Sequence, residues 1–281
     1  MRLCAVLVSL LWCTSAFAQT DIGSGLMRAT FKIEGPGSTG TAFVVGRPTQ
    51  SDPHRAWNIL VTAAHVLEHI KGDKAVLHCR KKKGNTYERS PVTIPIRKKG
   101  KALWTKHRKA DVAVMYLPLP PDVDLYLIGT GTFITDNEIK KFEVHPGDRL
   151  LALGFPFGAE GNEFGFPILR SGSIASFPVT RAEGGDTFLF DFEVHHGNSG
   201  GPVFMCEENA SYGGSVHVGG YQGIIGIVSQ GKTINEKMHS LFETRSEQHP
   251  INVAVIVHAS LIKEAIDMLP ELEHTNNKRI R

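Results

Sequence analysis

The sequence predicts an all-β protein made of two comparable antiparallel units, with one helix near the C-terminus. Short apolar runs rich in Val, Ile and Phe alternate with clusters of Gly, Pro, Asn or Lys, which is typical of strands joined by turns. A proline-rich segment, residues 117–124, divides these runs into two groups of about six. Only residues 258–269 show apolar spacing of three and four, and Pro270 follows them.

An export signal is expected over residues 1–18. It has one positive charge at Arg2, an apolar run over residues 3–12 and a small-x-small cleavage site at residues 16–18. The apolar run is shorter than the roughly 20 residues that a membrane-spanning helix needs. We therefore expect an exported product, secreted or periplasmic, without a membrane anchor.

Six strands are expected in the N-terminal unit, residues 19–120. Their apolar runs are, in order, ATFKIEG, GTAFVVG, NILVTAAHVL, KAVLHC, VTIPI and DVAVMYL. The C-terminal unit, residues 121–281, continues with RLLALGFP, FPILRSGSIASF, TFLFDFEV, GPVFMC, GIIGIVSQ and NVAVIV, and then the helix HASLIKEAIDML. The pattern thus predicts two six-stranded antiparallel barrels and a C-terminal helix.

A basic block lies within a chain of net charge +3. Residues 80–109 hold twelve Lys and Arg against one acid, Glu88. Such a block can bind polyanions. Here it consists of two turns, RKKKGN and RKKGK, and no aromatic residues alternate with them as a single-strand platform requires. We interpret both as solvent-exposed turns and expect no nucleic-acid partner.

Two of the four cysteines, Cys79 and Cys206, lie outside the export signal. An oxidising compartment would permit a disulfide between them. The other interpretation is two separate buried thiols, and the sequence leaves both open.

One serine, Ser199 in HHGNSGGPVF, is surrounded by glycines. Acyl transfer needs a hydroxyl, a base, and backbone N–H donors for the oxyanion, which Gly197 and Ser199 could supply. Gly200 and Gly201 leave room for a substrate backbone. The string also matches the G-x-S-x-G elbow of α/β-hydrolases, but that elbow leads into a helix. The following GPVFMC is typical of a strand, which disfavours this alternative.

Candidates for the base and its orienting carboxylate stand at strand ends. His65 follows the apolar run of ILVTAAHVL, and Asp111 directly precedes the strand of ADVAVMYL. An acid at the start of an apolar strand has no packing reason to be there. Five other aspartates, in loop-like contexts, are weaker candidates: Asp73, Asp122, Asp124, Asp136 and Asp148.

These motifs resemble those of trypsin-like serine proteases with the chymotrypsin-type double β-barrel. VTAAHV, ADVAVM and GNSGGPVF occur in the order His, Asp, Ser, and the similarity is closest to the bacterial-type branch with the Htr and glutamyl endopeptidases. The resemblance covers roughly residues 27–268. It implies a serine endopeptidase that acts on polypeptides through an acyl-enzyme. Ser199 would be the nucleophile, His65 the general base, and Asp111 the group that orients the imidazole.

The resemblance also implies binding residues. The N–H groups of Gly197 and Ser199 would form the oxyanion hole, and Ser229, Gln230 and Gly231 would pair with the substrate backbone. Glu193, six residues before the nucleophile, matches the floor of the primary specificity pocket. It would favour Arg or Lys before the scissile bond, with small apolar residues as the alternative.

Several features depart from the family pattern. Asn198 replaces the aspartate that in digestive trypsins pairs with a newly cut N-terminus, so activation by that route is not expected. About a dozen residues follow the last helix, and we expect no PDZ module. His195 and His196 adjoin the site, but sequence neighbours rarely share one metal. We interpret them as residues that line the cleft, and expect no metal and no cofactor.

Two other functions remain as alternatives. The cleft could belong to a non-catalytic relative that only binds, or to an esterase that uses the same triad. The presence of His65, Asp111 and Ser199 together argues against a pure binding protein. The oligomeric state and the physiological substrate are open at this stage.

Overall fold

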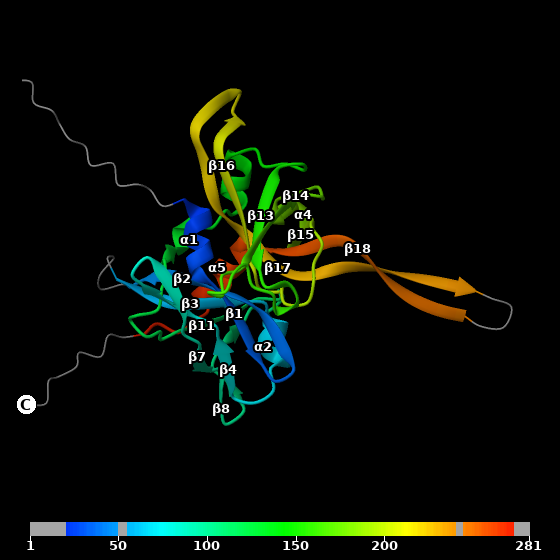
Figure 1. Ribbon diagram of the computed structural model, residues 1–281. Coiled ribbons are helices and arrows are strands. Elements are labelled where there is room, and N and C mark those ends of the chain that lie inside the picture. The colour runs from blue at the N-terminus through cyan, green and yellow to red at the C-terminus, as the bar shows by residue number, and fades with distance from the viewer. Residues whose placement is uncertain (1–20, 50–54, 240–243, 273–281) are drawn as a thin grey trace, which may run out of the picture.

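A computed structural model describes residues 21–49, 55–239 and 244–272 (Figure 1). The expected export signal lies outside these residues. The fold is built on two antiparallel sheets that curl into half-barrels, with a helix near the C-terminus. The predicted fold class, all-β with two antiparallel units and a C-terminal helix, is therefore confirmed. Within the described residues the first sheet has eight strands where six were expected, and the second has six. Among the residues described, no helix is long and apolar enough to cross a membrane.

The first sheet comes from the N-terminal half, in the order β10-β11-β3-β2-β1-β4-β7, and the short β12 pairs in parallel with β2. Its strands are β1 (Thr30–Gly35), β2 (Ser38–Pro48), β3 (Ala56–Thr62), β4 (Lys74–Leu77), β7 (Val92–Pro95), β10 (Thr105–Lys106), β11 (Ala113–Tyr116) and β12 (Ile128–Gly129). Side chains alternate along β2. Ala42 and Val44 face the core of this sheet, whereas Phe43 and Val45 face the second sheet.

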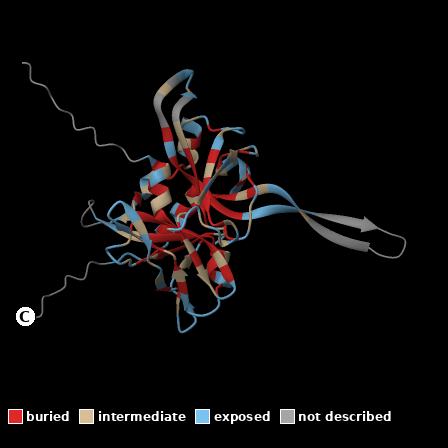
Figure 2. Cartoon of the chain, in the orientation of Figure 1, coloured by how far each residue is buried: buried red, intermediate tan, exposed pale blue. Residues whose placement is uncertain are grey.

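The second sheet has the order β14-β13-β16-β17-β18-β15. Its strands are β13 (Arg149–Gly154), β14 (Ile168–Ser173), β15 (Thr187–Asp191), β16 (Pro202–Tyr212), β17 (Ser215–His239) and β18 (Thr244–His258). Its core includes the fully buried rings of Phe188 and Phe190. A third hydrophobic cluster joins the two sheets, and Figure 2 shows buried residues concentrated where they meet.

The predicted C-terminal helix is α5 (Ala259–Asp267), which packs against β11 and β17 and so contacts both sheets. The other helical segments are α1 (Ile22–Ala29), α2 (Ala64–His69), α3 (Asp136–Lys141), α4 (Arg181–Gly184) and the 3₁₀ turns η1 (Thr130–Thr132) and η2 (Pro156–Gly158).

Helix α1 was not expected from the sequence, because two glycines in IGSGLMRA weaken its propensity. Two features stabilise it nevertheless. The Asp21 carboxylate caps its N-terminus by accepting from the Gly23 N–H at 2.7 Å. Its apolar face, with Ile22 and Leu26, is buried in the cluster between the sheets.

The two basic turns form small hairpins, β5 (Arg80–Lys83) with β6 (Thr86–Arg89), and β8 (Arg97–Lys98) with β9 (Lys101–Ala102). Lys82, Lys83 and Lys98 are exposed as predicted. Arg80 is the exception, since its side chain is fully buried. The expectation of a uniformly solvent-exposed turn was therefore wrong at this position.

The Arg80 guanidinium joins segments far apart in the chain. It donates to the carbonyl oxygens of Met27, Arg28 and Thr30 at 3.1–3.2 Å and to that of Gly165 at 2.8 Å. It also lies over the rings of Phe31 and Phe166, 4.8 and 4.1 Å from their centroids. Burial lowers the pKa of Arg80 to about 10, so the side chain remains charged at neutral pH. A charge buried in this way is stabilised by its carbonyl partners.

Cys79 and Cys206 are not bonded to each other. Cys79 is buried in the core of the first sheet, and Cys206 packs against the cluster between the sheets. The structure therefore agrees with the second interpretation of these cysteines, two separate thiols.

Strand β17 takes part in two projecting hairpins (Figure 1). Its first part pairs with β16, and its later part pairs with β18. The apolar runs GIIGIVSQ and NVAVIV predict only the buried parts of these strands. The structure extends both strands outward, and pairing continues to His239 and Thr244. We call residues 232–239 of β17 with residues 244–250 of β18 the arm.

Candidate active site

His65 lies where β3 leaves the first sheet and α2 begins. Its ring Nδ1 is 2.7 Å from Asp111 Oδ2, and its backbone N–H donates to Asp111 Oδ1 at 3.0 Å. One carboxylate therefore holds both the ring and the backbone of the histidine. With the Nδ1 proton directed at Asp111, the Nε2 of a neutral ring is left as the proton acceptor.

Asp111 precedes β11 and is fixed from the other sheet as well. The hydroxyl of Ser229, on β17, donates to Asp111 Oδ2 at 2.6 Å. Burial alone would raise the pKa of this carboxyl, but the hydrogen bonds from His65 and Ser229 outweigh it and lower the pKa to about 2. Asp111 is therefore ionised at neutral pH. Sequence reasoning gave Ser229 only a backbone role and missed its hydroxyl.

The loop before Asp111 is held by His107. The His107 Nδ1 accepts from the backbone N–H of Ala110 at 3.0 Å, and its Nε2 is 3.1 Å from the Glu264 carboxylate on α5. His107 is buried, and its contact with Glu264 connects the Asp111 loop to the C-terminal helix. The helix thus helps to position the acid of the site.

Ser199 lies in the turn between β15 and β16, which glycines make possible. Gly197 has φ +95° and Gly200 has φ +85°, in the left-handed region. A Cβ at Gly197 would collide with the carbonyl oxygen of Phe155, and one at Gly200 with that of Thr41. The glycines beside the serine therefore allow close backbone contacts as well as the bend itself.

Thr41, on β2 of the first sheet, ties this turn to the other half of the molecule. Its hydroxyl donates to the Gly197 carbonyl at 2.7 Å, and its N–H donates to the Ser199 carbonyl at 2.9 Å. The Thr62 hydroxyl, at the end of β3, donates to the Thr41 carbonyl at 2.7 Å. Nothing local in the sequence marks Thr41, because its partners are distant in the chain.

The orientation of two peptide groups determines where the turn's N–H groups point. The His196 carbonyl accepts from the Phe157 N–H at 2.6 Å, and the Asn198 carbonyl accepts from the Gly201 N–H at 3.0 Å. In a trans peptide the N–H is opposite to the carbonyl. The Gly197 and Ser199 N–H groups therefore point away from these partners, and neither donates to a backbone carbonyl within the described residues. No local sequence pattern predicts this role of Phe157.

These groups meet at a cleft of about 580 Å³. Six of the predicted site residues line it, together with the adjacent pair His195 and His196 and with two further residues. The complete lining is His65, His69, Asp111, Val194, His195, His196, Ser199, Ser229, Gln230 and Gly231. The Ser199 hydroxyl donates to the Ser229 carbonyl at 2.9 Å. The predicted base and acid thus lie next to strands of the first sheet, and the predicted nucleophile and substrate-pairing stretch belong to the second.

Glu193, predicted at the floor of the specificity pocket, is not among the residues that line the cleft. Its carboxylate is 3.7 Å from His195 Nε2, and its side chain is about half exposed. Val194 lines the cleft instead and lies against Gly231. His195 is also covered by the exposed ring of Phe157, which stacks on it at 4.6 Å.

Asn198 is almost completely buried and lies against Gly154 of β13. A charged residue at so buried a position would need a partner. As an amide it carries no charge to neutralise.

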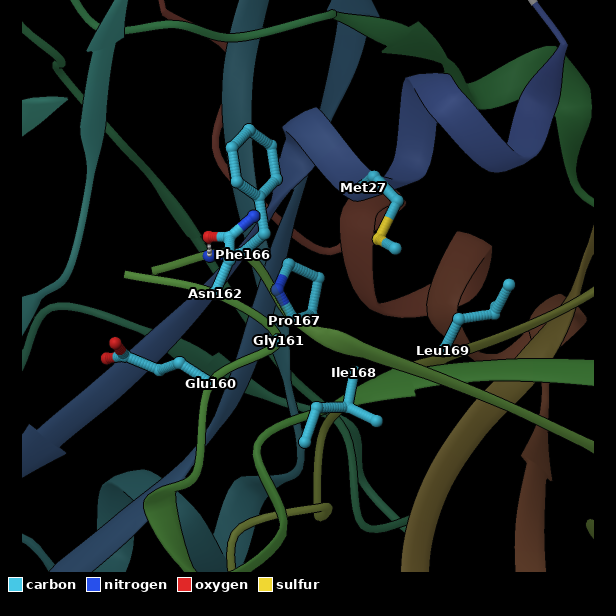
Figure 3. A pocket seen from close by; sticks show the side chains of 8 residues that line it. All are labelled: Met27, Glu160, Gly161, Asn162, Phe166, Pro167, Ile168 and Leu169. Carbon is cyan, nitrogen blue, oxygen red and sulfur yellow. Dashed lines mark hydrogen bonds between the residues drawn. The ribbon is translucent and has the colours of Figure 1, made fainter. Parts of the chain in front are cut away.

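A second hollow, of about 610 Å³, lies beside helix α1 (Figure 3). Its lining consists of Met27, Glu160, Gly161, Asn162, Phe166, Pro167, Ile168 and Leu169. None of the predicted site residues borders it. Glu160 forms an ion pair with Lys32 at 2.9 Å and another with Arg89. This region therefore connects the loop after β13 to the first sheet.

Comparison with known proteins gives a family match and a similar solved structure. The sequence model of the family described as trypsin-like peptidase domain matches residues 39–213. A solved structure, that of Rv3671c from M. tuberculosis H37Rv in an inactive mutant form, is 15% identical in sequence. The alignment covers 90% of this chain and 92% of that one, with a TM-score of 0.45. No curated protein matches the chain.

Proposed function

Since the chain belongs to the trypsin-like peptidase domain family, we propose that it is a serine endopeptidase with Ser199, His65 and Asp111 as its catalytic triad. One observation supports this most directly. Asp111 of the first sheet is hydrogen-bonded to both His65 and Ser229, and the Ser229 carbonyl accepts from the Ser199 hydroxyl. The three groups share one open cleft.

In the proposed reaction the Ser199 oxygen attacks the carbonyl carbon of the scissile peptide bond. Its hydroxyl turns from the Ser229 carbonyl toward His65 Nε2, which takes the proton. Asp111 holds the ring and stabilises the imidazolium. The N–H groups of Gly197 and Ser199 bind the oxyanion of the tetrahedral intermediate.

Collapse of this intermediate breaks the carbon–nitrogen bond, and the leaving amine takes the proton from His65. The acyl group remains on Ser199 as an ester. Water, deprotonated by His65, then attacks this ester and releases the acid product, and the proton returns to Ser199. The reaction is hydrolysis and needs no redox partner.

Two finer features belong to the proposal. We expect small apolar side chains before the scissile bond, the alternative to Arg or Lys named above, because Val194 and Gly231 line the cleft and Glu193 does not. The export-signal pattern of residues 1–18, with its small-x-small cleavage site, supports export. N-terminal sequencing of the protein recovered from expressing cells should then begin near Gln19.

Labelling with a fluorophosphonate probe tests the triad. We expect one adduct, which peptide mass spectrometry locates on Ser199. Ser199→Ala should abolish labelling and lower kcat by about 10⁶-fold, whereas Ser211→Ala, at an exposed position on β16, should change neither. A folded protein that takes up no probe would contradict the proposal and favour the binding-protein alternative. Hydrolysis of an ester but not of the matching amide would favour the esterase.

A further inference from the structure

The edge of β17 that faces β16 becomes open at one defined point. Pairing with β16 runs to Ile227, opposite Pro202. The next residue, Val228, is still covered, because its carbonyl accepts from the Gly200 N–H at 2.7 Å and its N–H donates to the Gly201 carbonyl at 2.9 Å. From Ser229 onward, no described strand pairs with this edge.

The open edge begins at the nucleophile. The Ser229 carbonyl, its first group, accepts from the Ser199 hydroxyl at 2.9 Å. The resemblance to trypsin-like proteases implies that Ser229 and Gly231 pair with the substrate backbone. The edge does not end at Gly231, since β17 continues to His239.

The opposite edge of β17 is held by β18 along the whole arm. Pairs run from Gly231 with Ala254 to His239 with Thr244. Between Gly231 and Thr233 the extra residues lie in β18, where Asn252 has φ +56°. This irregularity is therefore on the β18 side. A second one, between Val228 and Gln230, places the extra residue Ser229 in β17, where the open edge begins. Beyond Gln230, β17 has no extra residue and continues as an extended strand with one edge paired and one edge open.

We propose that residues 232–239 of β17 bind the part of the substrate that precedes the scissile bond, as a third strand of the arm. This inference rests on the proposed function and extends it. A substrate antiparallel to β17, with its first residue at Ser229 and its third at Gly231, brings its fourth to about eleventh residues alongside 232–239. At about 3.3 Å per residue the added surface is roughly 26 Å long.

The chemistry of this surface defines the substrate class. Main-chain N–H and C=O groups give affinity with little dependence on sequence. The substrate must be extended over about ten residues, so unfolded or loosely folded polypeptides fit and short peptides use only part of the site. At the base of the arm the exposed side chains of Ile234 and Ile251 offer apolar contact. Long open edges are rare in folded proteins unless something pairs with them.

Two nested peptides with the same scissile bond test this proposal. One has three residues before that bond, and the other has ten. We expect kcat/KM to be at least ~10-fold higher for the longer peptide, from a few net hydrogen bonds. N-methylation of alternate backbone amides in its outer seven residues should remove this gain.

Shortened variants locate the effect. In the arm variant an Asn-Gly turn replaces residues 233–250, and in the matched control the same turn replaces residues 208–220 of the β16–β17 hairpin. We expect the arm variant to cut the short peptide within about twofold of wild type and to lose the gain for the longer one. The control should keep the gain.

Binding of fluorescent versions of both peptides to the Ser199→Ala protein gives a readout without turnover. If the longer peptide binds more tightly and the arm variant loses this difference, the inference is supported. Failure of the wild-type protein to cut either peptide contradicts only the proposed function. Equal behaviour of the two peptides, or a gain that survives in the arm variant, overturns the inference. The inference is also overturned if the wild-type protein is a dimer, the arm variant is a monomer, and the gain for the longer peptide persists. The open edge of β17 would then pair with a second copy of the chain.

Discussion

The two sheets fix their parts of the cleft by different means. Beside the first sheet, the Asp111 carboxylate accepts hydrogen bonds from the ring and backbone N–H of His65 and from the hydroxyl of Ser229. On the second, Ser199 is held by backbone contacts around Gly197 and Gly200, where no Cβ fits. The first half therefore depends on the charge and shape of a few side chains. The second depends on the course of the main chain.

Loss of charge should have the largest effect on the first half. Asp111→Asn leaves a neutral amide that favours the wrong imidazole tautomer, and we expect kcat to fall by about 10⁴-fold with little change in fold. Asp122→Asn, at an exposed ion pair with Lys81, is the control and should leave kcat unchanged. Steady-state kinetics with one peptide measures both. A loss below about tenfold for Asp111→Asn would assign the orienting role to another group.

The next largest loss of kcat is expected when a Cβ is added to a glycine of the turn around Ser199. Gly197→Ala forces the turn away from the Phe155 carbonyl and displaces one of the two proposed oxyanion donors, so we expect kcat to fall by about 10²–10³-fold. Gly185→Ala is the matched control, because Gly185 has φ +94° but no atom near its added Cβ. It reproduces the backbone strain without the collision. Equal losses in the two variants would show that strain alone is responsible.

The link between the halves can be weakened at Arg80. Arg80→Met keeps the apolar stem but leaves the carbonyls of Met27, Arg28, Thr30 and Gly165 without their donor. We expect a loss of about 3–5 kcal/mol in the free energy of unfolding. Lys82→Met, next but one in the same basic turn and exposed, should change it by less than about 0.5 kcal/mol. Urea denaturation compares the two, and similar values would refute a structural role for Arg80.

A smaller effect concerns pH and the start of α5. Burial lowers the pKa of His258 to about 4, below the 6.5 of an unfolded chain. Between these values the unfolded chain binds a proton that the folded chain does not, so stability falls as pH drops from 6.5 toward 4. The expected loss is about 2 kcal/mol between pH 7 and pH 4.5. His258→Gln should flatten this part of the curve, measured by denaturation at several pH values. An unchanged slope would show that His258 is not its source.

Local sequence patterns predicted the two sheets, the C-terminal helix and the cleft residues, because each leaves a local signal. Apolar runs mark strands, and glycines mark the turn around Ser199. Thr41, Phe157 and the Ser229 hydroxyl left none, since their partners lie on other strands. Arg80 resembles its lysine neighbours in sequence, and only the fold buries it. Glu193 was placed by counting from Ser199, and a count along the chain does not give the direction of a side chain.

The contacts of Thr41 also bear on when the protein becomes active during its synthesis. Thr41 and its partner Gly197 are 156 residues apart in the chain. Contacts of such separation form late in folding, after loop closure. A nascent chain therefore carries His65 and Asp111 well before Ser199, the proposed nucleophile, lies in a structured turn. We expect hydrolytic capacity to arise in the last folding step, when the two sheets dock, so that a partly made chain is harmless to its neighbours.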